Sequence, residues 1–343
     1  MASHRRSSQS GLTRSARTTV LSAAAATAAA LAAAPAGAAP TAPADGPKAR
    51  VDRLYAEAEK ATEGFNAAAE RSGVLRERVG VLQDEVARGQ ERINRMRGVL
   101  GSVAGAQYRS GGMDPALRLL LTSDPDGYLD RAAALDRMGE QQAGVLADLG
   151  REQRRLDQQR AEATRTLADL ERSRAAVAAH KRTVERKLAE ARTVLNSLTA
   201  KERQDVDGAD RASRSGGRED LPPVAGGVSG RAAAAVAAAR GAVGRPYVWG
   251  ANGPDGFDCS GLMQWSYAQA GVGIPRTSQA QRGAGRHVSL AEARPGDLVT
   301  YRDDASHVAM YMGNGQVVHA PYPGAPVRYD PVGMMPVSAI TRV

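Results

Sequence analysis

The sequence predicts two folded parts, a long antiparallel helical hairpin followed by a compact α+β domain. Three observations favour this division. From Val51 to Val103 apolar residues recur at steps of three and four, and a second helical pattern runs over 128–201. After residue 231 the pattern changes to short helices and then to short strands. Hydrophobic residues make up 42% of the chain, which is enough for a globular core in the second part.

Residues 1–38 have the pattern of a secretory signal. Basic residues precede an apolar stretch at 20–34, and Ala36-Gly37-Ala38 matches a small-x-small cleavage site. A transmembrane helix is the alternative, but alanine dominates the stretch and Pro35 closes it early. We therefore expect a secreted protein; the sequence leaves the choice between Sec and Tat export open. The basic residues are Arg5, Arg6, Arg14 and Arg17.

The charge of the chain suits a protein that works among anionic polymers. The formal net charge is +9, and removal of the four arginines of the signal leaves about +5. No basic run is interleaved with aromatic residues, so the sequence predicts no nucleic-acid partner.

Residues 48–205 are predicted to form a coiled-coil helical hairpin. The first arm keeps a heptad repeat, whereas the second is less regular and indicates a register shift. Between them, 110–112 break the helix and 122–127 form a turn. The hairpin could act in reach, docking or occlusion, or as a passive spacer. Its tip segment, 115–121, is apolar and could close the hairpin internally or present a surface to a partner.

Residues 206–230 are predicted to be a flexible linker, because Gly, Ser, Asp, Arg and Pro replace the apolar periodicity. The last domain, 231–343, begins with helices and ends in an antiparallel sheet, the order typical of an α+β fold. The predicted helices are 232–243 and 259–270, with a helical turn near 275–280; the predicted strands are 298–301, 306–312 and 316–319, with 327–329 and 340–342 as candidate edge strands.

Cys259 is the only cysteine in the chain, and it lies between a turn and the helix that starts there. A helix N-terminus stabilises a thiolate, which is the nucleophilic form of cysteine. The alternative is a small buried hydrophobic residue. A single cysteine in a secreted protein has no partner for an internal disulfide, and this favours a reactive thiol.

His307 and His319 are predicted to meet at one end of a β-hairpin. His307 starts one strand, His319 ends the next, and Gly313-Asn314-Gly315 joins them. This placement allows a thiolate–imidazole pair of Cys259 and His307, with His319 orienting the base. Two unrelated histidines at strand ends are the simpler alternative. A zinc site is disfavoured because close-spaced ligand pairs are missing, and the sequence indicates no cofactor.

Residues 231–343 resemble the NlpC/P60 cysteine peptidases, which have a papain-like fold. The matching segments, in the order of the family, are Tyr247-Val248-Trp249-Gly250, Phe257-Asp258-Cys259-Ser260-Gly261-Leu262, Arg276-Thr277-Ser278-Gln279, Pro295-Gly296-Asp297-Leu298-Val299, Ser306-His307-Val308-Ala309-Met310-Tyr311 and Val318-His319-Ala320. Ala251 departs from the family, where a second glycine is common.

The resemblance implies roles for six residues. Cys259 would be the nucleophile, His307 the general base and His319 the orienting residue. Tyr247, Asp258 and Ser260 would contact the substrate or shape the site.

The resemblance also implies an activity, the hydrolysis of peptidoglycan stem peptides between γ-D-glutamyl and the diamino acid in wall remodelling or division. In some relatives the coiled coil docks on a membrane complex of the FtsEX type, or blocks the active site. Two alternatives remain: an adaptor that regulates wall hydrolysis through its coiled coil, and a thiol acyltransferase or transpeptidase on the same fold.

Overall fold

The computed structural model describes residues 46–109, 111, 115–121, 127–202 and 229–343. The predicted signal lies outside the described residues, and so does the predicted linker up to residue 228. Within the described ranges, no helix combines the length and the apolar character that a membrane crossing requires.

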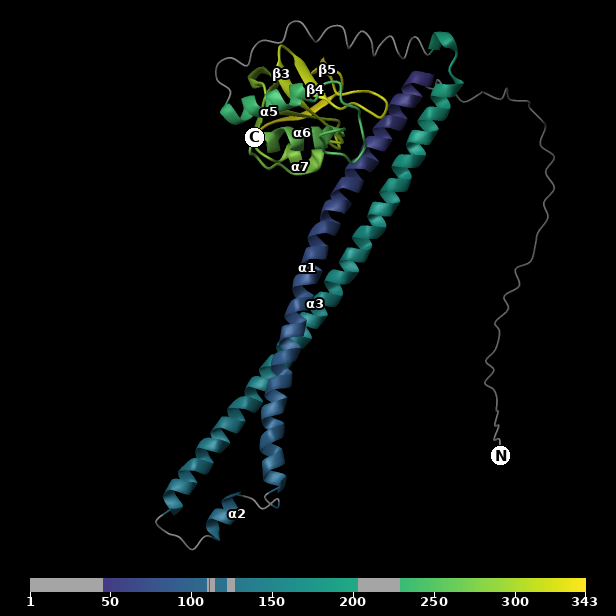
Figure 1. Ribbon diagram of the computed structural model, residues 1–343. Helices are drawn as coiled ribbons and strands as arrows, with labels where there is room; N and C mark the ends of the chain where they lie inside the picture. The colour runs from purple at the N-terminus through teal and green to yellow at the C-terminus, as the bar shows by residue number, and fades with distance from the viewer. Residues whose placement is uncertain (1–45, 110, 112–114, 122–126, 203–228) are drawn as a thin grey trace, which may run out of the picture. The chain divides into compact units, whose positions relative to one another are not determined.

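The predicted hairpin is confirmed. Helix α1 (Pro47–Arg109) and helix α3 (Tyr128–Ser197) run antiparallel beside each other, and the short helix α2 (Pro115–Leu120) lies at the turn end (Figure 1). The hydroxyl of Ser173 donates to the carbonyl of Ala68 across the pair at 2.8 Å, and Arg92 pairs with Glu152 nearer the tip.

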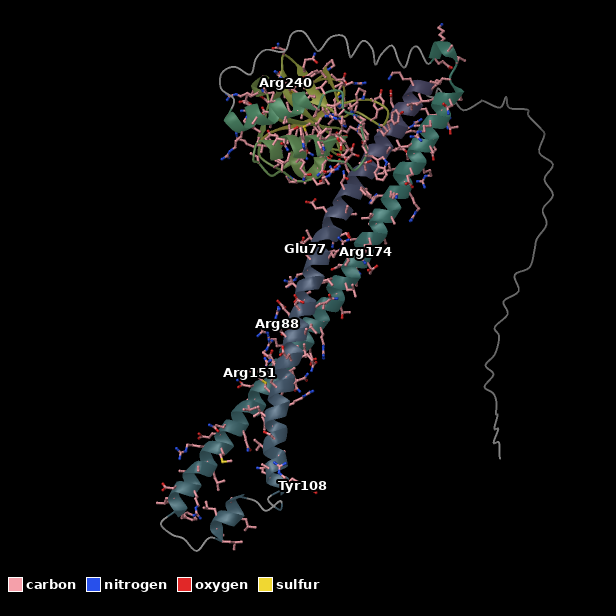
Figure 2. All side chains as sticks on the ribbon, viewed as in Figure 1. Glu77, Arg88, Tyr108, Arg151, Arg174 and Arg240 are labelled. Atoms are coloured by element: carbon pink, nitrogen blue, oxygen red, sulfur yellow. The ribbon has the colours of Figure 1, made fainter. Side chains whose placement is uncertain are left out.

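A narrow apolar seam holds the two arms together. Leu82 and Ile93 of α1 and Leu156, Leu170 and Val184 of α3 are all at most 3% exposed. Charged side chains cover the outer surface; Figure 2 labels Glu77, Arg88, Arg151 and Arg174, all exposed. This distribution is typical of a coiled coil, in which burial of the seam stabilises the pair.

The C-terminal domain is α+β, as predicted. Its helices are α5 (Gly230–Gly241), α6 (Cys259–Gln269) and α7 (Ser278–Arg282), with a 3₁₀ turn η1 (Leu290–Glu292). Six antiparallel strands form one sheet in the order β1-β6-β2-β3-β4-β5. The strands are β1 (Arg286–Val288), β2 (Leu298–Tyr301), β3 (His307–Gly313), β4 (Gln316–His319), β5 (Arg328–Pro331) and β6 (Val337–Arg342).

The sheet separates two apolar clusters, because alternate side chains of a strand face opposite sides. Val308 and Met310 of β3 belong to the cluster that includes Leu262 and Met263 of α6. Ala309 of β3 belongs to the other cluster, with residues of β2, β4 and β6. The strand that starts at His307 is therefore fixed from both faces.

One strand prediction is wrong. Residues 340–342 were expected at an edge, but β6 lies inside the sheet between β1 and β2. The actual edge strand β1 reads Arg286-His287-Val288 and is mostly exposed. It has too few apolar residues for the alternation that marks a strand in sequence.

Candidate active site

Cys259 is the first residue of α6, and the loop before it is tied to the helix start. Asp258 is the N-cap, and its carboxylate accepts a hydrogen bond from the backbone N–H of Gly261 at 2.7 Å. Gly261 has no room for a side chain, since an added Cβ would overlap the carbonyl oxygen of Ala251. Cys259 is 1% exposed, and its sulfur accepts a backbone hydrogen bond from Val308, the neighbour of His307.

His307 and His319 meet as the sequence predicts. His307 begins β3 and His319 ends β4, and Nε2 of His307 lies 2.8 Å from Nδ1 of His319. Both rings are fully buried and cross at 89°. Such a chain of ring nitrogens can hold one imidazole in a fixed orientation beside a thiol.

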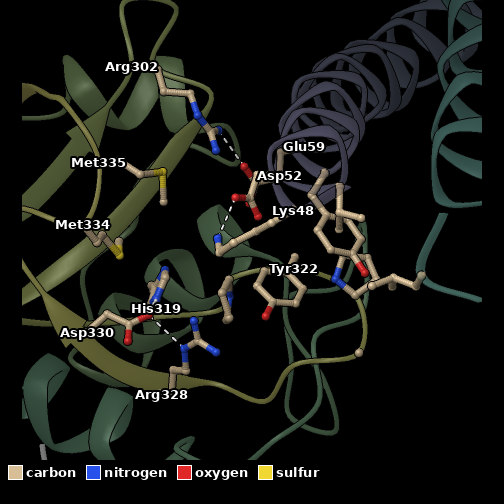
Figure 3. Close-up of a pocket in the computed structure, with 16 residues that line it drawn as sticks. Lys48, Asp52, Glu59, Arg302, His319, Tyr322, Arg328, Asp330, Met334 and Met335 are labelled. Atoms are coloured by element: carbon tan, nitrogen blue, oxygen red, sulfur yellow. Dashed lines mark hydrogen bonds and ion pairs between the residues drawn. The ribbon is translucent and has the colours of Figure 1, made fainter. Parts of the chain in front are cut away.

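The hydrogen-bond chain continues to a residue that sequence reasoning missed. Nε2 of His319 lies 2.8 Å from Oδ2 of Asp330, which also accepts from Nε of Arg328 at 2.8 Å (Figure 3). Arg328 stands directly opposite His319 in the pairing of β4 with β5. The recognisable feature in the sequence is the charged pair Arg328-x-Asp330 on a strand that follows His319.

The three predicted substrate-contact residues lie around Cys259. Asp258 is fully buried and accepts two hydrogen bonds from the guanidinium of Arg276, at 2.9 and 2.6 Å. Ser260 accepts a third from the same group at 2.8 Å. Burial and the nearby Cys259 raise the pKa of Tyr247 well above its usual value, which keeps this phenol neutral beside the thiol.

Helix α1 reaches into this site. The sequence left such occlusion open as one role of the hairpin but did not indicate which residues make the contact. Glu63 of α1 accepts hydrogen bonds from the hydroxyl of Ser260 and the backbone N–H of Ser278, both at 2.7 Å. The thiol of Cys259 lies 3.7 Å from the same carboxylate. A carboxylate of the hairpin thus occupies the space beside the candidate nucleophile.

A second carboxylate of α1 reaches the histidine. Oε1 of Glu59 lies 3.1 Å from Nδ1 of His307, and Arg302 donates to Oε2 of Glu59 at 2.6 Å. One turn beyond Glu63, the amide of Asn66 donates to Asp258 at 3.1 Å. All three α1 side chains are at most 3% exposed.

Two aromatic contacts between α1 and the C-terminal domain flank these polar contacts. Tyr55 stacks on Tyr322 at 4.6 Å between ring centroids, and Phe65 meets Trp249 edge-to-face at 5.2 Å. Four of the contacting residues of α1, Tyr55, Glu59, Glu63 and Asn66, recur at steps of three and four. This stripe is the feature of the sequence that could have indicated a second buried face of α1.

The contact with α1 changes the ionisation of the site. Burial, followed by the charges of Glu63 and Asp258, raises the pKa of Cys259 well above its usual range. The thiolate expected from the helix N-terminus is therefore disfavoured in this state, because burial and the two nearby carboxylates outweigh the helix start. Burial also opposes ionisation of Glu59, but His307 and Arg302 outweigh it and hold the pKa of Glu59 below its usual value.

Beside the histidines, part of the cleft stays open. A pocket of about 520 Å³ is lined by Asp52, Tyr55 and Glu59 of α1 and by His319 and Asp330 of the sheet (Figure 3). Among the described residues, no group of three or more His, Cys, Asp or Glu side chains is arranged to hold a metal ion.

Comparison with known proteins defines the class of this domain. Residues 244–338 match the model of the NlpC/P60 family. The C-terminal domain is thus an NlpC/P60 domain, and the resemblance found in the sequence is confirmed.

Several curated proteins are similar over this region. A probable endopeptidase of Mycobacterium tuberculosis is 46% identical over 118 residues, which are 34% of this chain and 31% of the relative. A probable endopeptidase of Corynebacterium glutamicum is 45% identical over 109 residues, 32% of this chain and 52% of the relative. The bifunctional muramidase/DL-endopeptidase CwlT of Bacillus subtilis is 51% identical over 83 residues, 22% of this chain and 25% of the relative.

Solved structures are similar over the same part of the chain. The peptidoglycan hydrolase RipB of Mycobacterium tuberculosis is 38% identical, covers 33% of this chain and 64% of its own, and gives a TM-score of 0.31. The chain spans less than two thirds of the length of each of these relatives.

Proposed function

We propose that the protein is a secreted, wall-associated cysteine endopeptidase that hydrolyses peptidoglycan stem peptides. The observation that carries the proposal is the buried pair of His307 and His319, together with the hydrogen bond from Val308, the neighbour of His307, to the sulfur of Cys259 at the start of α6. The names of the relatives, which include endopeptidases and a peptidoglycan hydrolase, support the substrate class.

In the proposed reaction, His307 takes the thiol proton through Nδ1, and the sulfur of Cys259 attacks the scissile carbonyl. Backbone N–H groups at the start of α6 stabilise the oxyanion. The bond to the leaving amine breaks as His307 returns the proton to that amine. Water then attacks the thioester, releases the acid and restores the thiol.

The place of Glu63 supports the γ-D-glutamyl–diamino acid bond as the target. The hydroxyl of Ser260 and the N–H of Ser278 both donate to this carboxylate, and Arg276 adds a positive charge nearby. A γ-linked glutamyl residue carries a free α-carboxylate close to its scissile carbonyl. The same donors can bind that group once Glu63 has left.

We further propose that the structure represents a closed state in which α1 excludes substrate. Substitution of Glu63 by arginine should open it, because a second cation cannot be buried beside Arg276. Glu77→Arg is the matched control, since it makes the same charge change on an exposed position of the same helix.

The test is mass spectrometry of products from defined muropeptides, with the full chain and its Glu63→Arg variant. We expect new amino and carboxyl termini at the γ-D-glutamyl bond, and no product when Cys259→Ala is added. Product formation by the Cys259→Ala variant, or none by any variant, would refute the proposal.

Two further experiments distinguish the hydrolase from the two other functions. A free amine added to the reaction would yield amide products with an acyltransferase, whereas a hydrolase yields acids. An adaptor whose peptidase is inactive would support growth of a deletion strain even as the Cys259→Ala variant. The intact Cys259, His307 and His319 set favours the hydrolase.

The hairpin tip is proposed to dock on a membrane complex of the FtsEX type. Leu117, Leu120 and Leu121 at the tip are between 50% and 72% exposed. Leu120→Asp should abolish capture of such a complex by the full chain, whereas Val74→Asp, an exposed apolar residue far from the tip, should not.

A further inference from the structure

The hydrogen-bond chain that starts at His307 ends at Asp330. We propose that Asp330 is a positioning residue, which through His319 fixes the ring nitrogen of His307 that carries a proton. The inference rests on the function proposed above, in which His307 is the base.

Strands β3, β4 and β5 bring His307, His319 and Asp330 into one hydrogen-bonded chain. Val317 pairs with Asp330 and His319 pairs with Arg328, so these side chains share one face of β4 and β5. The chain runs from Nε2 of His307 to Nδ1 of His319, and from Nε2 of His319 to Oδ2 of Asp330, each step 2.8 Å. His307, His319 and Asp330 are at most 3% exposed, so little of these hydrogen bonds is open to competition from water.

The direction of each hydrogen bond follows from Asp330. A carboxylate only accepts, so Nε2 of His319 must carry a proton. Burial lowers the pKa of His319 to about 4, so the ring is neutral near pH 7 and its Nδ1 has a free lone pair. Nδ1 of His319 therefore accepts from Nε2–H of His307. Once Glu59 has left, the other ring nitrogen of His307, Nδ1, is the basic one.

The neighbours of Asp330 keep it ionised. Burial opposes ionisation, but His319 and Arg328 outweigh it, and the pKa of Asp330 lies below its usual value. Arg328 and His319 both donate to Oδ2, and the phenol of Tyr301 is the other titratable group that senses this charge. Oδ1 is buried with no hydrogen-bond partner among the described residues, so the side-chain hydrogen bonds of Asp330 are made by Oδ2.

The same domain contains a second buried pair of aspartate and arginine, Asp297 and Arg342, which involves no catalytic candidate. Asp297 is also 3% exposed, but Arg342 binds both of its oxygens, at 2.9 and 2.6 Å. Among the described residues, no histidine donates a hydrogen bond to the Asp297 carboxylate. Asp297→Asn is therefore a matched control for the loss of a buried carboxylate paired with arginine.

The tautomers can be observed without any catalysis. Two-bond ¹H–¹⁵N correlation spectra of the full chain separate protonated from unprotonated ring nitrogens, and the chain has only five histidines to assign. We expect His319 to carry its proton on Nε2 and none on Nδ1. The opposite tautomer in the unsubstituted protein would overturn the proposal, whatever the variants do.

Substitutions of Asp330 test whether this residue sets the tautomer of His319. Asp330→Ala should produce a mixture of His319 tautomers, whereas Asp330→Asn should keep the original one, because its amide oxygen can face both donors. Asp297→Asn should leave the His319 signals unchanged. An unchanged tautomer in a folded Asp330→Ala variant would show that Asp330 does not set it.

Activity provides a second readout in the Glu63→Arg background. Asp330→Ala should lower kcat by about ten- to a hundredfold with little change in KM, and Asp330→Asn should recover part of the loss. An equal kcat in the Asp330→Ala and unsubstituted proteins would contradict the proposal. If no protein in this background hydrolyses the muropeptide, the proposed function fails, and the spectra still decide the role of Asp330.

Discussion

Individual carboxylates decide the chemical state of the candidate nucleophile. Glu59 lies against Nδ1 of His307, the nitrogen proposed to take the thiol proton. Glu63 lies beside the sulfur of Cys259 and raises its pKa together with burial and Asp258. A protonated thiol next to an occupied base cannot attack a carbonyl. The two residues of α1 thus oppose catalysis by charge as well as by bulk.

Closure should weaken as the pH rises from about 4.5 to 7. Burial and the neighbouring Asp258 raise the pKa of Glu63 from 4.5 to about 7, so in this range the closed state binds a proton that an open state lacks. A rise in pH removes that proton and weakens closure by up to about a hundredfold. Glu59 acts in the opposite direction, but only below pH 4.5, because its pKa is lowered.

The measurement is tryptophan fluorescence against pH, since Trp249 touches Phe65 of α1 in this closed state and opening would remove that contact. Glu63→Gln keeps the acceptor for Ser260 and Ser278 but has no proton to lose. We expect its fluorescence to change much less between pH 4.5 and 7. An identical pH dependence in both proteins would show that Glu63 is not the titrating group.

At the scale of elements, the junction of the 247–258 loop with α6 fixes the candidate nucleophile. The backbone N–H of Asp258 donates to the carbonyl of Ala251 at 2.9 Å, and that same carbonyl faces the Cα of Gly261. The first turn of α6 and the loop can approach this closely only because residue 261 lacks a side chain.

Gly261→Ala should lower the free energy of unfolding of the C-terminal domain by about 1–3 kcal/mol, the usual cost of overpacking. Gly241→Ala is the control, because nothing lies within 4 Å of an added Cβ there. Both tryptophans, Trp249 and Trp265, belong to this domain, so fluorescence in a urea titration reports its unfolding. Equal midpoints for the two variants would mean that the loop moves away at no cost.

At the scale of the whole described chain, α1 has two buried faces. One packs against α3 through residues such as Leu82, and near its start the other packs on the NlpC/P60 domain through the stripe from Tyr55 to Asn66. A partner that separates these contacts would expose Cys259. If the tip docks as proposed, such a partner would couple docking to access at the site.

Opening should be visible as reactivity of the single thiol. Glu63→Arg should raise the rate of Cys259 alkylation by iodoacetamide at least about tenfold, because it removes both the cover and the carboxylate that disfavours the thiolate. Glu77→Arg should react like the unsubstituted chain. Equal rates in all three proteins would contradict a closed state.

The sequence alone determined the local features. Heptads predicted the hairpin, a turn before an apolar helix placed Cys259, and the Gly313-Asn314-Gly315 turn brought His307 to His319. Each of these depends on neighbours in the chain, where periodicity and turn chemistry are informative. The resemblance carried by these segments identified the NlpC/P60 domain.

The tertiary structure decided the contacts between residues far apart in the chain. The inner position of β6, the hydrogen bond from His319 to Asp330 and the insertion of Glu59 and Glu63 beside Cys259 all depend on it. A glutamate on a coiled coil has the pattern of a solvated residue, and only packing shows that it is buried. The sequence therefore placed the reactive groups, whereas the three-dimensional packing set their protonation and their access to substrate.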